Sequence, residues 1–134
     1  MKLASFKHDG RATYGVAQAD RYLQPPADFL NRYPDLAAVL RANAQRELEQ
    51  AAISSGISIQ VAATQALPVL PTPQKFICVG LNYKTHVAET KRDDSEYPAL
   101  FVRFADSLAA NGDVVHRPSF SERFDWEGEL AVVI

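Results

Sequence analysis

The first part of the chain alternates short apolar runs with polar turns, a pattern typical of a small antiparallel sheet. Residues 2–7 and 11–18 read as two strands. Between them, Asp9-Gly10 is a dipeptide that favours a tight hairpin turn. A second turn at residues 19–21 precedes a further extended stretch. The pattern therefore predicts a short β-meander at the N-terminus.

The apolar spacing then changes from two to between three and four residues, which predicts an amphipathic helix. Pro34-Asp35 suits the start of this helix, and Gly56 suits its C-terminal end. Its predicted apolar face consists of Leu36, Val39, Leu40, Ala44, Leu48, Ala51 and Ala52. The N-terminal unit is thus expected to be a small sheet covered by one helix.

Three prolines, Pro68, Pro71 and Pro73, indicate a stiff extended linker, because proline cannot donate to a sheet ladder. We place a boundary there, between an N-terminal domain of residues 1–70 and a second domain of residues 74–134.

The second domain alternates strands with one short helix, which makes the expected fold class α+β. Residues 75–80 and 99–104 are continuous apolar runs, typical of strands buried on both faces. A helix is expected over about 82–91, a short strand at 114–116, and a final strand at 126–134. The expected architecture is the opening part of a mixed β-roll.

Composition narrows the functional classes. The formal net charge of −2 provides no basic patch for nucleic acid or an anionic membrane. No apolar run approaches the about 18 residues that a transmembrane helix needs, and the N-terminus lacks a secretory signal. Cys78 is the single cysteine, which fits a reducing compartment, and the cytoplasm is the expected location.

Two acidic residues stand close together at the start of the last predicted strand. Glu127 and Glu129 are two residues apart, so a strand would project both from one face, about 7 Å apart at the Cα atoms. Asp125 would share that face. Neighbouring carboxylates repel each other when partly buried, and a hard divalent cation such as Mg²⁺, Mn²⁺ or Ca²⁺ would neutralise them. The alternative is a solvated edge strand.

His86 and Glu89 are three residues apart on the predicted helix, and therefore lie on one face. A carboxylate beside an imidazole fixes the tautomer of the ring and helps it act as a general base. The alternative is an ordinary exposed pair on a surface helix, which is common and weak. Asn82, just before, suits a helix N-cap.

Taken together, these segments resemble the fumarylacetoacetate hydrolase family. The matching residues are, in order, Lys75–Tyr83, His86, Glu89, Tyr97–Phe104, Ser107, Asn111–Asp113 and Ser121–Ile134. The stretch up to about Leu70 is similar to the small domain that precedes the catalytic domain in many members. The chain would cover only part of that catalytic domain.

The resemblance implies a role for each matching residue. Glu127 and Glu129 would ligate Mg²⁺, Mn²⁺ or Ca²⁺, together with an aspartate that the family carries further along its sequence. His86 and Glu89 would form the catalytic dyad, with Asn82, Tyr83 and Arg103 binding substrate.

One departure from the family concerns Arg103-Phe104, which stands where many members have Lys-Pro. Arginine cannot act as a neutral base and favours a carboxylate, so this departure bears on substrate preference.

The implied function is metal-dependent hydrolysis of a C–C bond in small 2,4-dioxo acids. The alternatives are a decarboxylase, hydratase or isomerase of 2-oxo acids on the same scaffold, or a non-catalytic dimerising module. The expected partner is a small 2-oxo acid, without nucleic acid or membrane, and the full-length protein is expected to be a homodimer. Since no third acidic ligand follows Glu129, we expect this chain to be a fragment with little or no activity by itself.

Overall fold

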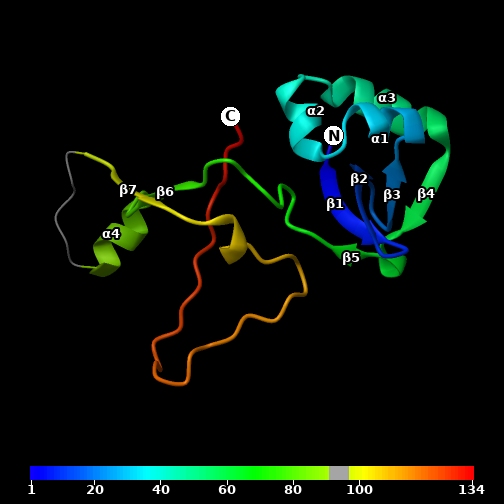
Figure 1. The fold of residues 1–134 in the computed structure, drawn as a ribbon. Helices are drawn as coiled ribbons and strands as arrows, with labels where there is room; N and C mark the ends of the chain where they lie inside the picture. The colour runs from blue at the N-terminus through cyan, green and yellow to red at the C-terminus, as the bar shows by residue number, and fades with distance from the viewer. Residues whose placement is uncertain (91–96) are drawn as a thin grey trace.

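The computed structural model describes residues 1–90 and 97–134. Its N-terminal part forms an antiparallel five-stranded sheet in the order β4-β3-β2-β1-β5, and three helices lie together on one side of that sheet (Figure 1). A separate two-stranded sheet, β6-β7, lies further along the chain. The mixed α+β class that the sequence predicts is confirmed.

The N-terminal hairpin forms where the sequence predicts it. β1 (Leu3–His8) pairs antiparallel with β2 (Arg11–Ala17), and His8 faces Arg11 across the turn. Asp9 and Gly10 both have positive φ, of 50° and 74°. A two-residue turn with both central residues in this region matches the right-handed twist of the strands, which is why Asp-Gly is a reliable signal here.

The rest of the sheet combines predicted and unpredicted strands. β3 (Arg21–Gln24) pairs with β2, as the second predicted turn requires. Two strands were not predicted: β4 (Ile57–Gln60) pairs with β3, and β5 (Gln65–Ala66) pairs with β1. A 3-10 turn, Val61–Ala63, connects them.

The proline-rich stretch begins in contact with the sheet. The Ser5 hydroxyl donates to the Val69 carbonyl at 2.7 Å, and Leu70 packs against the core. The N-terminal sheet therefore keeps contact with the chain as far as Leu70.

The single predicted helix is wrong in extent, because residues 34–56 form two helices and a further, unpredicted helix precedes them. The helices are α1 (Ala27–Arg32), α2 (Leu36–Arg41) and α3 (Gln45–Ser55). Asp35 caps α2 by accepting from the Ala38 amide at 2.6 Å, and Gly56 ends α3 with φ 66°, so the predicted start and end of the helical region are confirmed. The break between α2 and α3 contains Asn43 at φ 53°, a left-handed conformation that asparagine tolerates better than most residues.

The core lies between the helices and one face of the sheet. Its buried members are Tyr14, Val16, Phe29, Leu36, Val39, Ala44, Leu48 and Ala52. Five of these eight residues belong to the predicted helical face, and this agreement explains why the periodicity was informative even though the helix is interrupted.

Tyr14 is the polar member of this core, and its hydroxyl donates to the Tyr33 carbonyl at 2.5 Å. Burial, with smaller contributions from Asp35 and Tyr33, raises the Tyr14 pKa above its ordinary value. A raised folded-state pKa gives stability that is complete below the unfolded pKa of about 10 and is lost as pH rises beyond it.

We therefore expect Tyr14→Phe to cost about 1–3 kcal/mol at neutral pH, because the Tyr33 carbonyl loses its partner. The gap between wild type and variant should narrow above about pH 10, where only the unfolded wild type ionises this phenol. Urea unfolding followed by circular dichroism at neutral and alkaline pH measures both. A gap that stays constant or widens with pH would contradict this expectation.

The second sheet is smaller and more exposed than predicted. β6 (Ile77–Gly80) pairs antiparallel with β7 (Ala99–Val102), and α4 (Lys84–Thr90) lies between them in sequence. Every residue of β7 is exposed, so the prediction of strands buried on both faces is wrong for the chain as described. Lys91, the last residue of the predicted helix, lies outside the described residues.

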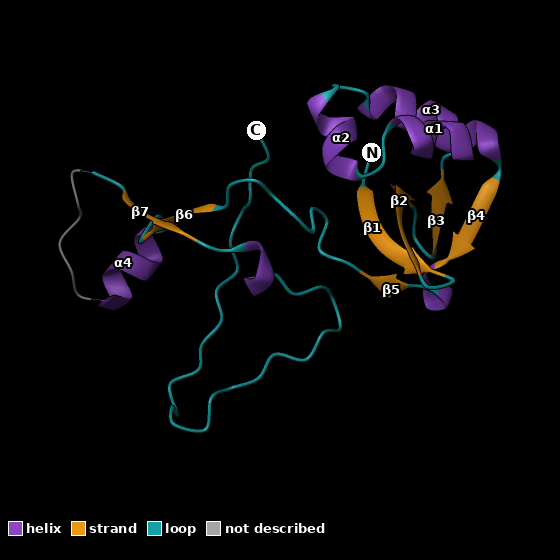
Figure 2. Cartoon of the chain, in the orientation of Figure 1, coloured by secondary structure: helices purple, strands orange, loops and turns teal. Residues whose placement is uncertain are grey.

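Beyond β7 the chain is irregular. Apart from the 3-10 turn Ala105–Ser107, Figure 2 shows this part as loop, so the predicted strands at 114–116 and 126–134 are wrong. The side chains of Trp126, Leu130 and Val132 are 84%, 83% and 76% exposed. A strand forms only when neighbours pair with its backbone, and none does so within residues 1–90 and 97–134.

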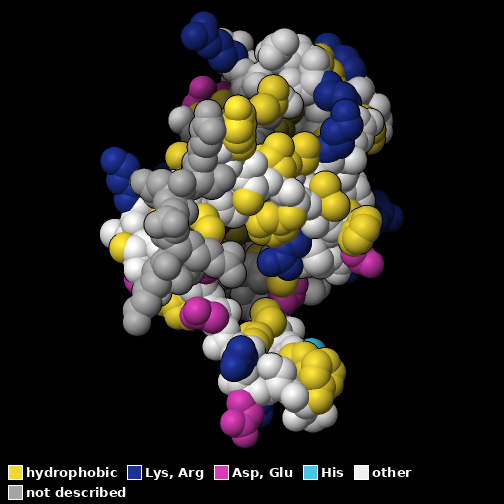
Figure 3. Space-filling model, turned by 90° about the vertical axis from the view of Figure 1, so that its left-hand side faces the viewer, with side chains coloured by type: hydrophobic (Ala, Val, Ile, Leu, Met, Phe, Trp, Pro, Cys, Tyr) yellow, Lys and Arg dark blue, Asp and Glu magenta, His cyan; other side chains and the backbone are white. Residues whose placement is uncertain are grey.

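Most of the large apolar residues beyond β7 are exposed. Figure 3 shows hydrophobic side chains at the surface of one face of the molecule. Of the helices that the structure describes, none has both the length and the apolar character to cross a bilayer.

Candidate functional site

The turn between β6 and α4 carries the first part of the site. Gly80 ends β6, and Leu81 follows with φ 55°. The left-handed conformation thus falls on Leu81 and not on the glycine before it. Such a conformation costs a non-glycine residue about 1–3 kcal/mol, and this kind of strain concentrates at functional sites. Helix α4 begins at Lys84, so Asn82 lies two residues ahead of it rather than at the cap.

His86 projects from α4 and contacts two carboxylates. Its Nε2 lies 3.0 Å from Glu127 Oε1, and its Nδ1 lies 3.7 Å from Glu89 Oε2. The His86 side chain is 37% exposed, compared with 57% for Glu127 and 77% for Glu89. The imidazole therefore lies between an acid of its own helix and an acid 41 positions away in sequence, with the distant one closer.

The predicted acids lie together, although the strand that was expected to align them is absent. A shallow pocket of about 190 Å³ is lined by Tyr83, Thr85, His86, Glu127, Gly128 and Glu129. Asp125 is not part of this lining; its carboxylate accepts from the neighbouring Trp126 amide at 2.8 Å. Gly128 has no side chain, so no side chain projects between Glu127 and Glu129.

Tyr83 connects the helical and acidic parts of the site. Its phenolic oxygen accepts a hydrogen bond from the Leu130 amide at 2.9 Å. Thr85 also lines the pocket, and sequence reasoning missed it because a threonine beside a histidine carries no distinctive signal.

Asn82 and Arg103, both predicted to bind substrate, do not line this pocket. The Arg103 amide donates to the Phe76 carbonyl at 3.0 Å, which extends the β6-β7 pairing by one residue. Their substrate-binding roles stay predictions.

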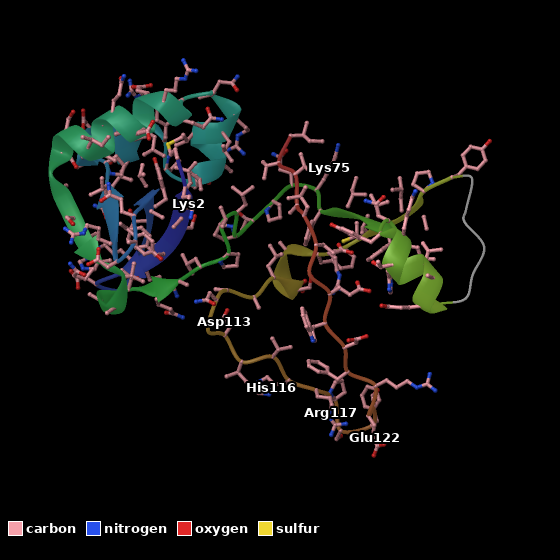
Figure 4. All side chains as sticks on the ribbon, turned by 180° about the vertical axis from the view of Figure 1, so that it is seen from behind. Lys2, Lys75, Asp113, His116, Arg117 and Glu122 are labelled. Carbon is pink, nitrogen blue, oxygen red and sulfur yellow. The ribbon has the colours of Figure 1, made fainter. Side chains whose placement is uncertain are left out.

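Two other polar regions are separate from this pocket. A larger hollow of about 460 Å³ on the N-terminal sheet is lined by His8, Asp9, Arg11, Thr13 and Gln24, among others, and it contains none of the predicted site residues. His116, Arg117 and Glu122 lie along the extended loop, away from α4 (Figure 4). The smaller pocket is the candidate site because predicted His and Glu residues line it, although the other hollow is larger.

The smaller pocket offers oxygen ligands of the type that a hard cation binds, but too few of them to complete a site. Glu127 and Glu129 offer carboxylate oxygens, the ligands that Mg²⁺, Mn²⁺ and Ca²⁺ prefer. Six to eight oxygen ligands are typical for Ca²⁺, and within residues 1–90 and 97–134 no group of three or more His, Cys, Asp or Glu side chains is arranged to hold a metal. The two glutamates would supply part of a coordination sphere.

Comparison with known proteins relates residues 75–134 to a family. Residues 75–134 match the family described as fumarylacetoacetate (FAA) hydrolase, C-terminal. An uncharacterized protein of Methanocaldococcus jannaschii is 45% identical over 62 residues, which cover 46% of this chain and 26% of that protein.

A second relative is the mitochondrial oxaloacetate tautomerase FAHD2A of Homo sapiens. It is 38% identical over 98 residues, covering 65% of this chain and 31% of the relative. The chain thus spans less than a third of the length of either relative. Residues 75–134 thus match the fumarylacetoacetate hydrolase family, and the resemblance drawn from the sequence is confirmed for this part of the chain.

Proposed function

We propose that this chain forms part of an enzyme that binds a small 2-oxo acid beside a divalent cation and moves a proton at the carbon next to the oxo group. One observation carries the proposal: the His86 imidazole lies 3.0 Å from Glu127, in a pocket that Glu129 also lines. A proton-transfer group and two cation-binding groups are thereby available to one small ligand.

The residues of the pocket have different roles in this proposal. His86 is the group that takes up and returns a proton, because histidine changes charge near neutral pH. Glu89 and Glu127 lie on either side of the ring and favour its orientation toward the pocket. Glu127 and Glu129 would hold the cation, which when bound supplies Lewis-acid polarisation of the 2-oxo group. The open mouth of the pocket admits a small, charged substrate.

Two reactions use this machinery. In keto–enol tautomerisation, His86 removes a proton from carbon 3 and returns it to the oxo oxygen, so atoms balance without a further reactant. This reaction is the first candidate, because the named relatives include oxaloacetate tautomerases. Hydrolysis of a C–C bond in a 2,4-dioxo acid is the second candidate, and the name of the matching family favours it.

Product analysis of the full-length gene product separates these reactions. We would supply oxaloacetate enriched in its enol form and, separately, an acylpyruvate, each with Mg²⁺ or Mn²⁺. Accelerated loss of enol absorbance without new products supports tautomerisation, and release of pyruvate from acylpyruvate supports hydrolysis. Absence of both activities would refute the proposed function.

Metal binding can be tested separately from turnover. Glu127→Gln should weaken Mn²⁺ binding by about tenfold or more, because even partners outside the metal's own ligand shell are worth about 10–100-fold in affinity. Calorimetric titration of the full-length gene product measures this change. Glu122→Gln is the matched control, since Glu122 is an exposed acid on the loop and lines neither pocket. Equal affinities for wild type and Glu127→Gln would contradict a ligand role.

A further inference from the structure

The acidic segment of the site has little support of its own. Residues 124–134 form no helix or strand, and all are exposed. The contacts that connect this segment to the α4 region include Glu127 with His86, and the Leu130 amide with the Tyr83 hydroxyl. The two contacts bracket Glu129 in sequence, so they define where both acids lie.

We propose that Tyr83 is a positioning residue, which clamps the acidic segment onto the start of α4 and so brings Glu127 and Glu129 to His86. The functional meaning of the clamp rests on the proposed function, although the contact itself does not. The sequence had assigned Tyr83 to substrate binding. A phenol that accepts from Leu130 keeps its own proton to donate, so the clamp does not remove that predicted role.

The hydrogen bond between the Leu130 amide and the Tyr83 hydroxyl is needed because the ion pair alone is weak. The His86–Glu127 pair is partly exposed, and exposed ion pairs contribute little to stability because solvent screens them. A hydrogen bond from a backbone amide fixes the main chain itself, which a side-chain ion pair does not do. Since Leu130 is one residue beyond Glu129, fixing its amide restricts the path of the backbone through both glutamates.

The position of Tyr83 suits this role. It lies immediately before α4, and its carbonyl accepts from the Val87 amide at 3.0 Å, so its backbone is part of the first helical turn. The clamp therefore joins the acidic segment to the same turn that carries His86. Movement of the helix would carry both parts of the site together.

The test is Tyr83→Phe in the ¹⁵N-labelled 134-residue chain, because this change removes the acceptor oxygen and keeps the ring. We expect the Leu130 amide proton to shift and to exchange with solvent about fivefold faster, as the loss of a hydrogen bond of about 1 kcal/mol implies. We also expect nuclear Overhauser contacts between the His86 ring and the Glu127 side chain to weaken. Tyr22→Phe is the matched control, because Tyr22 belongs to β3.

The outcomes are distinct. Unchanged Leu130 exchange in Tyr83→Phe would overturn the clamp. Faster Leu130 exchange with intact His86–Glu127 contacts would show that the bond exists but does not position the acids, which also overturns the proposal. If both readouts change while the full-length gene product acts on neither 2-oxo acid, the proposed function fails and the clamp stands.

Discussion

Replacing His86 with glutamine in the full-length gene product is expected to lower turnover of a 2-oxo acid by about 10²–10⁴-fold, the usual contribution of a positioned acid–base group. Glutamine keeps an N–H that can donate to Glu127, so the pocket should hold its shape. It cannot take up a proton near neutral pH. The loss should therefore appear in kcat, measured by the decay of enol absorbance or by the release of product.

Two comparisons make this result specific to proton transfer. His116→Gln should leave turnover unchanged, because His116 is exposed on the loop away from α4. Mn²⁺ affinity of His86→Gln should stay near that of wild type, since the cation is assigned to the glutamates. Turnover by His86→Gln within about twofold of wild type would exclude His86 as the acid–base group.

The features that the sequence predicted best depend on the backbone preferences of single residues. Asp9-Gly10 forms its turn, Asp35 caps its helix, and Gly56 ends α3 in the left-handed region. In each case the residue satisfies a local requirement of the backbone that distant parts of the chain do not alter. Predictions of this kind transfer directly from sequence to structure.

Predictions that needed distant partners were less successful. The apolar run at 126–134 has strong strand character, but sheet formation depends on a neighbouring strand that the run itself does not specify. The helix break at Asn43 was missed because the apolar spacing continues through it from Val39 to Leu48. Periodicity reports which side chains are buried, and it does not report whether the helix between them is continuous.

The candidate site includes one contact that follows from a local pattern and one that depends on distant parts of the chain. The pair His86 and Glu89 follows from helical spacing, and the structure places them 3.7 Å apart. The closer acid, Glu127, was predicted only as a cation ligand, because no local pattern connects it with a helix 41 positions earlier. Side-chain chemistry indicated the residues of the candidate site, whereas the three-dimensional structure shows which of them are neighbours.

Leu48→Ala is expected to destabilise the N-terminal sheet and its helices by about 2–5 kcal/mol, the range for large-to-small changes in a packed core. Leu48 is fully buried in α3 and belongs to the core cluster with Tyr14 and Val39. The cost combines lost apolar burial with a cavity that the neighbours fill only partly. Small domains have about 5–15 kcal/mol of stability in total, so a large share would be lost.

The same helix provides the matched control for this prediction. Ile53 lies in α3 with 61% of its surface exposed, so Ile53→Ala removes a similar volume from the same helix without opening a cavity. Its effect should stay within about 0.5 kcal/mol. Urea unfolding followed by far-ultraviolet circular dichroism is the suitable measurement, because the single tryptophan, Trp126, is exposed and lies outside this core. Equal destabilisation by both variants would contradict the assignment of Leu48, rather than Ile53, to the packed core.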